Sequence, residues 1–90
     1  MRIEFDPKKE RENLSKHGVD FSTAENVFAD PLSLSFVDSK HSRNEDRFII
    51  IGNDGRGILT VRFTMRGKSI RIIGAGYWRK GKKIYEKENR

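Results

Sequence analysis

The sequence predicts one α+β domain over residues 1–90, in which a short N-terminal strand and a helical hairpin pack on a four-stranded antiparallel sheet and a helix ends the chain. Three observations predict this fold. Residues 32–36 and 58–73 alternate apolar and polar side chains, as strands with one buried face do. Residues 47–52 form an almost continuous apolar run, which is typical of a buried central strand. Residues 6–31 contain two sets of helix start and stop signals.

The first strand and the first helix are expected at the N-terminus. Residues 2–5 alternate charged and apolar side chains, which predicts a short strand. Asp6 followed by proline fits the N-cap and first position of a helix. Gly18 fits the left-handed residue that ends a helix, after which Val19 would fold back onto Leu14.

The second helix of the hairpin is expected to begin at Ser22-Thr-Ala-Glu25, which matches a capping box. Its end is expected before Pro31, because a proline disfavours helical backbone in the residue that precedes it. Ala24, Val27 and Phe28 share one face of this helix. The apolar face predicts that the hairpin covers one side of the sheet.

The first sheet strand that follows the hairpin places Leu32, Leu34 and Phe36 on one side, and we expect that side to face the core. A polar loop over residues 38–46 leads into the central strand. The tail, which contains the basic run 79–83 and ends in Ile84-Tyr-Glu-Lys-Glu, is expected to form the last helix, although the glycine within the basic run weakens a helix by about 1 kcal/mol relative to alanine.

The last two strands form a hairpin whose register carries functional information. If Arg66-Gly67 is a two-residue turn, Arg62 lies directly opposite Arg71. Like charges in directly opposed positions destabilise a sheet, by an amount on the order of 0.2–1 kcal/mol. The pair therefore favours a bound carboxylate or phosphate. The alternative is that both side chains splay apart into water and cover apolar surface with their stems.

Composition limits the function classes. The chain has 90 residues, a formal net charge of +6 and a pI near 9.9, which favours nucleic acid or an acidic protein as partner. It has no cysteine, which excludes a disulfide framework and thiolate chemistry. No signal peptide and no apolar run near the ~20 residues that span a bilayer are present, so we expect a cytoplasmic protein without a membrane partner.

The two histidines are the candidate catalytic groups. There is no phosphate-binding glycine loop, metal-spaced ligand set or serine elbow, so neither a metal nor a cofactor is expected. His17 and His41 are expected in two loops among charged residues. RNA cleavage by attack of the 2′-OH needs a base, an acid and cations that stabilise the phosphorus charge. Alternatively, His17 complements free helix carbonyls and His41 is a solvated loop residue.

The aromatic pair Tyr77 and Trp78 precedes the basic run Arg79–Lys83. Its rings would either stack on RNA bases or pack the last helix onto the sheet. The basic run would be either a phosphate track or a solvated helix face.

The order of motifs resembles the BrnT-type toxins, small bacterial ribonucleases of type II toxin–antitoxin systems. The resemblance covers nearly the whole chain and includes Gly52, Arg71-Ile-Ile73 and Tyr85-Glu86. Its most specific part is the Lys-His-Gly-Val element joined to Phe-x-Asp-Pro. The motifs in order are Phe5-Asp-Pro-Lys8, Asn13-Leu-x-Lys-His-Gly-Val-x-Phe21, Ala24-x-x-Val-Phe-x-Asp-Pro31 and Asp38-x-x-His-Ser-x-x-Glu-x-Arg47.

The resemblance implies a RelE-like fold and cytoplasmic cleavage of mRNA without a metal. It also implies a dimeric ribbon-helix-helix antitoxin of BrnA type as partner. The chain would then contact operator DNA only through this antitoxin. The catalytic candidates are His17, His41, Glu45 and Arg71, and the substrate-binding candidates are Lys16, Arg43, Arg47, Arg62, Arg79 and Lys80.

The chain departs from the resembling family after its last strand. Family members usually carry Ile-Ser-Ala-Arg there, whereas this chain has Ile73-Gly-Ala-Gly76. A serine and an arginine expected near the phosphate are therefore absent. Either Arg79 substitutes from the next turn, or the chain is a catalytically weakened module that binds RNA or its antitoxin.

Overall fold

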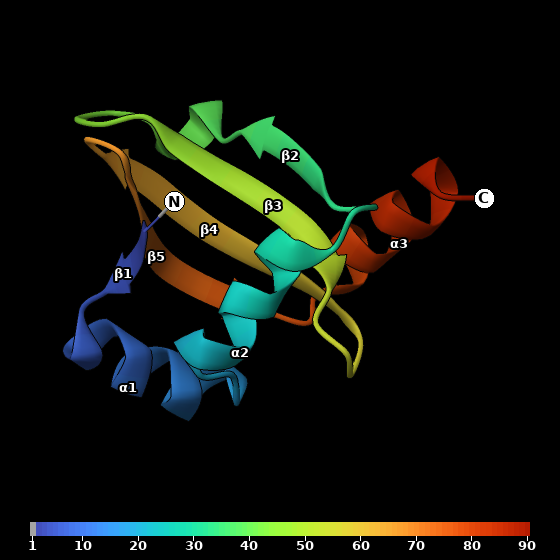
Figure 1. The fold of residues 1–90 in the computed structure, drawn as a ribbon, viewed down its shortest axis with the longest axis horizontal. Coiled ribbons are helices and arrows are strands. Elements are labelled where there is room, and N and C mark those ends of the chain that lie inside the picture. Colours follow the sequence, from blue (N-terminus) through green and yellow to red (C-terminus); the bar gives the residue numbers. More distant parts are fainter. Residues whose placement is uncertain (1) are drawn as a thin grey trace.

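The computed structural model describes residues 2–90, and within them a five-stranded mixed sheet carries three α-helices and two short 3₁₀ helices (Figure 1). The strands lie in the order β1-β5-β4-β3-β2. The elements are β1 (Arg2–Phe5), α1 (Pro7–His17), α2 (Phe21–Glu25), η1 (Asn26–Ala29), β2 (Leu34–Val37), η2 (Ser39–His41), β3 (Arg47–Asn53), β4 (Ile58–Arg66), β5 (Ser69–Gly76) and α3 (Arg79–Glu88).

The α+β class, the N-terminal strand, a strand over the apolar run and the last helix are confirmed. The prediction of a four-stranded antiparallel sheet is wrong, and β3 is neither the central strand nor buried on both faces. Strand β1 is a fifth strand and pairs in parallel with β5, with Ile3 beside Ile70 and Phe5 beside Ile72. This pairing covers an edge of β5 that would otherwise expose unpaired backbone groups. It also adds Ile3 and Phe5 to the core.

The predicted register of the last hairpin is also wrong. The two-residue turn is Gly67-Lys68, with Gly67 at φ 60°, because this turn needs glycine at its first central position. A bulge next to Arg62 shifts the register once more. As a result Arg62 pairs with Gly74 and Arg71 pairs with Thr64. The two guanidinium groups are not opposed, so the argument for an anion forced between them no longer holds.

One face of the sheet, called the inner face here, carries the hydrophobic core. Strand side chains alternate between faces, and Leu59, Val61 and Phe63 of β4 all point inward and are buried. They pack with Phe21 and the predicted apolar face of the second helix, of which Val27 is fully buried. Figure 1 shows α1 and α2 side by side along the sheet, with α3 apart from them.

The opposite face, called the outer face here, is only partly covered. Strand β2 begins two residues later than expected, and Leu32 and Phe36 are 54% and 43% exposed, so their predicted position in the core is wrong. Phe36 pairs with Ile49 and Leu34 with Ile51, which places all four side chains on the outer face. On this face Phe36 is exposed and Leu34 and Ile49 are only partly buried, whereas Ile51 is buried close to Gly81 of α3.

The helix caps agree with the sequence only in part. Asp6 caps α1 and Gly18 ends it in the left-handed conformation, as predicted. However, Leu14 is exposed, and the buried residue of α1 is Asn13. Helix α2 is capped by Asp20 and not by the predicted box. Within residues 2–90, no helix has both the length and the apolar character that crossing a membrane requires.

Helix α3 is fixed against the sheet by a polar contact at one end and a close approach at the other. The Tyr85 hydroxyl donates to the Asp30 carboxylate at 2.7 Å, and the backbone N–H of Asn53 donates to the same oxygen at 2.7 Å. Near the start of the helix, Gly81 lies so close to Thr60 that a Cβ there would be 2.0 Å from its hydroxyl oxygen. These contacts place the first half of α3 over the outer face.

Candidate active site

A groove of about 770 Å³ lies on the outer face, between the end of α1, the loop after β2 and the first half of α3. Both histidines line it, although they are 24 positions apart in the sequence, from 17 to 41. Among the lining residues Asp38 is the only acid, so the charge of the groove is mainly basic. The lining residues are His17, Phe36, Asp38, Lys40, His41, Ile49, Ile51, Thr60, Arg62, Trp78, Lys80, Gly81 and Ile84.

His17 is brought to the groove by the buried amide of Asn13. This side chain donates to the carbonyls of Val19 and Ala75, both at 2.9 Å, and accepts from the Ala75 N–H at 3.0 Å. It thereby occupies the edge of β5 beyond the point where β1 ends. The last turn of α1 is held there, and the His17 ring meets the Trp78 ring edge-on at 5.2 Å between centroids.

His41 is oriented by a carboxylate. Its Nδ1 lies 2.9 Å from Oδ2 of Asp38, which is buried, while the His41 side chain is 54% exposed. The loop itself is closed by Ser42, whose hydroxyl donates to the Asp38 carbonyl at 2.7 Å and accepts from the Arg47 N–H at 2.9 Å. The imidazole is therefore fixed through Nδ1, and its Nε2 is left for a substrate.

Arg62 and Trp78 lie over two glycines of β5. The Arg62 guanidinium carbon lies 5.7 Å from the Trp78 ring centroid. A Cβ at Gly74 would lie 3.0 Å from Arg62 Nη2, and one at Gly76 would lie 2.5 Å from Cε2 of Trp78. The two glycines thus make room for these side chains, Gly74 for Arg62 and Gly76 for Trp78, whereas Arg79 lines a separate cavity.

A second cavity of about 650 Å³ adjoins the groove, because Lys40 and His41 line both. The predicted residues Arg43, Glu45 and Arg47 lie in this second cavity. Glu45 and Arg47 form an ion pair at 3.6 Å. They are therefore neighbours of His41 but do not line the groove itself.

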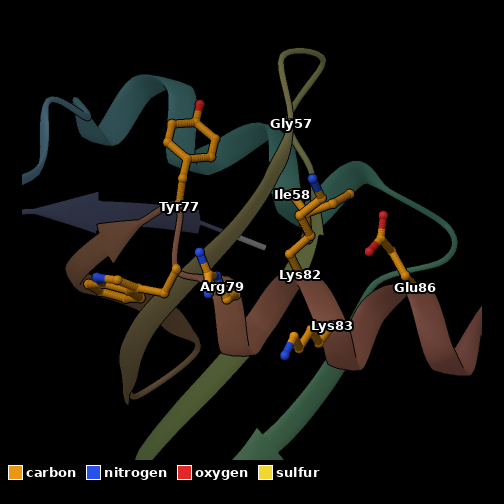
Figure 2. Close-up of a pocket in the computed structure, with 8 residues that line it drawn as sticks. Gly57, Ile58, Tyr77, Arg79, Lys82, Lys83 and Glu86 are labelled. Atoms are coloured by element: carbon orange, nitrogen blue, oxygen red, sulfur yellow. The ribbon is translucent and has the colours of Figure 1, made fainter.

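A third cavity, of about 650 Å³, is formed by the basic side of α3, the start of β4 and the segment that follows β5 (Figure 2). Arg79, Lys82 and Lys83 project from the helix there. Tyr77 points away from α3, and its hydroxyl donates to the Asp54 carboxylate. Burial and this carboxylate raise the pKa of Tyr77 to about 12, so it stays neutral at physiological pH.

Two predicted residues lie elsewhere. Arg71 is on the outer face but lies 3.5 Å from Glu4 of β1 and lines none of the three cavities. Lys16 is exposed at the end of α1, next to His17 in sequence. The structure thus brings together four predicted residues, namely His17, His41, Arg62 and Lys80.

Sequence reasoning missed Asp38 as a functional residue. The available signal was the spacing of Asp38 and His41, which are three positions apart. One turn of 3₁₀ helix brings two side chains at this spacing together. Phe36 was missed because alternation identifies the faces of a strand but does not tell which face is covered.

The arrangement combines the groups that phosphodiester chemistry uses. Imidazoles exchange protons near neutral pH, and guanidinium and ammonium groups stabilise phosphate charge. Within residues 2–90, no three side chains of histidine, aspartate or glutamate converge as a metal site would require. The groove therefore offers two proton-transfer groups and a basic rim from the chain's own residues.

Comparison with known proteins identifies the family. No individually curated protein is similar enough to the chain to count as a relative. The family described as "Ribonuclease toxin, BrnT, of type II toxin-antitoxin system" matches residues 5–81, which include both histidines, Asp38, Arg62 and Trp78. Since this match spans most of the sequence, the chain belongs to the BrnT family of ribonuclease toxins of type II toxin–antitoxin systems.

Proposed function

We propose that this chain is a metal-independent endoribonuclease that cleaves mRNA and is neutralised by a BrnA-type antitoxin. The observation that carries the proposal is the groove, in which two histidines, one of them paired with a buried carboxylate, share a surface with basic side chains. Family membership supports the ribonuclease activity. The substrate is single-stranded RNA in the cytoplasm, and the fold is of RelE type.

In the proposed reaction His41 is the general base. It takes the proton of a ribose 2′-OH at Nε2, and the 2′ oxygen then attacks the adjacent phosphorus. Asp38, bonded to Nδ1, stabilises the imidazolium that forms and is a positioning residue. His17 is the general acid and gives a proton to the leaving 5′ oxygen. The products are a 2′,3′-cyclic phosphate and a 5′-hydroxyl.

Basic side chains stabilise the extra negative charge of the pentacovalent phosphorus. Arg62 and Lys80 line the groove and are the proposed contacts of the reacting phosphate. Lys16, Arg43, Arg47 and Arg79 lie outside it and are proposed to bind the RNA backbone on either side, with Glu45 holding Arg47. The proposal leaves out Arg71, since Glu4 is its partner.

The proposal is tested by RNA cleavage in the presence of EDTA. His17→Ala and His41→Ala should each lower the rate about 10²- to 10⁴-fold, the usual contribution of a positioned acid or base. Lys9→Ala, an exposed change on α1, is the matched control and should cleave like the unmodified chain. Circular dichroism verifies that each variant is folded. Cleavage that needs Mg²⁺, or that survives both histidine changes, would exclude the mechanism.

A second candidate function is a non-catalytic module that binds RNA or the antitoxin. The glycines at positions 74 and 76, where the resembling family carries serine and arginine, favour it. It predicts RNA binding that weakens with salt, with no product formed. A gel-shift titration matched to the cleavage assay distinguishes the two functions.

The antitoxin is proposed to be a dimeric ribbon-helix-helix protein. In the toxin–antitoxin complex, it is the antitoxin that binds the operator DNA. The formal charge of +6 suits an acidic or amphipathic segment of such a partner. Co-purification with the product of the adjacent gene tests the assignment. A neighbouring gene of another fold class, or a product that does not bind, would contradict it.

A further inference from the structure

The two glycines on the outer face of β5 are buried beneath Arg62 and Trp78, two residues that line the groove. Any residue with a Cβ at Gly76 would place that atom 2.5 Å from the Trp78 ring, closer than such atoms approach in real structures. At Gly74 the same atom would press on the Arg62 guanidinium at 3.0 Å. The position of Trp78 therefore depends on the absence of a side chain at Gly76, whereas a side chain at Gly74 would require only a small shift of the Arg62 guanidinium.

Trp78 and Arg62 form a pair of planar groups, called the Arg62–Trp78 platform here. Both side chains are partly exposed and both line the groove. The guanidinium carbon is 5.7 Å from the ring centroid, within reach of a cation–π contact. Among the hydrogen bonds of residues 2–90, Arg62 Nε is buried without a partner. Because Nε is buried, an anion would meet the terminal nitrogens of the guanidinium, to which no acidic side chain of residues 2–90 is bonded.

The rest of the groove matches the chemistry of a nucleotide. Ile49, Ile51 and Phe36 give it an apolar floor, which suits a base. Lys40 and Lys80 lie at the same groove and suit the phosphates on either side. A base presents a flat aromatic face, whereas its phosphate is anionic. The side-by-side placement of apolar and basic surface therefore favours RNA over an ordinary apolar ligand.

We infer that the Arg62–Trp78 platform is a subsite on which one unpaired nucleobase of the RNA substrate stacks, with its phosphate held beside His17. The inference rests on the proposed function, whose substrate it makes specific. The His17 ring touches Trp78 edge-on at 5.2 Å, so a base on the platform sets the phosphate close to the proposed acid. Only unstacked bases expose the face that this needs, which selects single-stranded RNA.

The neighbouring aromatic residue does not serve this role. The hydroxyl of Tyr77 is bonded to Asp54, and its ring lines the cavity of Figure 2. Tyr77 is not among the residues that line the groove. Of the two aromatic residues that the sequence offered for stacking, the geometry selects Trp78.

The platform is tested with short RNAs whose reacting 2′-OH is replaced by 2′-deoxyribose, so that binding is measured without cleavage. Trp78 is the sole tryptophan of the chain, so quenching of tryptophan fluorescence reports on stacking directly. One RNA is complete, and a second carries an abasic site with all phosphates retained. The unmodified chain should bind the complete RNA about 5- to 100-fold more tightly, because stacking on an aromatic ring contributes that much.

Variants are compared by the anisotropy of the same RNAs carrying a fluorescent label. Trp78→Leu should lose the preference for the complete RNA and keep its affinity for the abasic one. Gly76→Val should act similarly with the tryptophan still present, because its side chain displaces the indole. Tyr77→Leu is the matched control and should keep the preference.

The outcomes separate the platform from the proposed nuclease. Equal binding of the two RNAs by the unmodified chain, or an unchanged preference in Trp78→Leu, would overturn the platform even if the natural RNA is cleaved. A preference that depends on Trp78 without any cleavage of natural RNA would support the platform and reject the nuclease.

Discussion

The inner and outer faces of the sheet use apolar residues in different ways. On the inner face α2 and η1 cover the strands, and Leu59 and Val61 are wholly inaccessible to solvent. On the outer face α3 covers only one end, and Phe36 remains 43% exposed beside the two histidines. Both faces alternate equally well in the sequence. What separates them is the covering layer, which leaves one face to build the fold and the other to build the site.

The largest expected effect on stability comes from a substitution on the inner face. Leu59→Ala should lower the free energy of unfolding by about 2–5 kcal/mol, because it removes fully buried methyl groups and leaves a cavity. Phe36→Ala should cost less than about 1.5 kcal/mol, since its ring is already in contact with solvent, and should instead weaken RNA binding. Urea denaturation measures both. Equal losses of stability would mean that the outer face is part of the core.

The next effect tests how closely α3 approaches the outer face. Gly81→Ala should destabilise the protein by about 1–3 kcal/mol, because the new Cβ would lie 2.0 Å from the Thr60 hydroxyl oxygen. Helix propensity alone predicts the opposite, a gain of about 1 kcal/mol.

Thermal denaturation of Gly81→Ala shows whether the substitution destabilises or stabilises the protein. Adding Thr60→Ala should recover most of the loss, since it removes the contacting oxygen. A stabilised Gly81→Ala would show that the helix sits farther from the sheet.

A smaller effect concerns the bond between Asp30 and Tyr85, which joins the layer of the inner face to α3. Burial raises the pKa of Asp30, but hydrogen bonds from the N–H of Asn53, the Tyr85 hydroxyl and the N–H of Leu32 outweigh it, and the pKa is lowered. The hydrogen bond to Asp30, together with burial, raises the pKa of Tyr85.

The pH dependence follows from the direction of these two shifts. Stability from Asp30 is present above its ordinary pKa of about 4 and is lost as the pH falls through the lowered value. Stability from Tyr85 is present below about pH 10 and is lost as the pH rises through the raised value.

Tyr85→Phe should cost about 1 kcal/mol at neutral pH and flatten both limbs of the curve of stability against pH. Urea denaturation across the pH range measures this. Unchanged limbs in the variant would show that other groups control the acid and alkaline unfolding.

The core of the fold was predictable because it depends on periodicity. The alternation in β4 and the glycine that ends α1 each indicate one local structure, and the apolar run of β3 indicated a strand although not its partly exposed outer side. The hairpin register was not predictable from the same pattern. Moving the turn by one residue shifts the pairing by two, which keeps Phe63 and Ile72 on the inner face in either register. The two registers are distinguished only by the positive φ that the turn requires at Gly67 and by the bulge next to Arg62.

The site was predictable by residue type but not by position. The sequence offered His17, His41, Arg62 and Lys80, and their common groove depends on long-range contacts of Asn13 and Asp30 that no local pattern encodes. The role of Gly74 and Gly76 was also hidden. From the sequence they were interpreted only as a departure from the pattern that the resemblance implies, whereas in the structure they make room for Arg62 and Trp78.

The smallest expected effect distinguishes two arginines on the outer face. Arg71 pairs with Glu4 at 3.5 Å, with side chains 29% and 31% exposed, so Arg71→Ala should change the free energy of unfolding by less than about 1 kcal/mol. Because it lies outside the groove, RNA cleavage should remain near the unmodified rate, whereas Arg62→Ala should lower it about tenfold or more. Arg71 pairs with Glu4 across the sheet, and this pair is the neighbour on the outer face of the pair formed by Arg62 and Gly74. A folded Arg71→Ala variant without activity would therefore mean that the reacting phosphate lies closer to β1 than proposed.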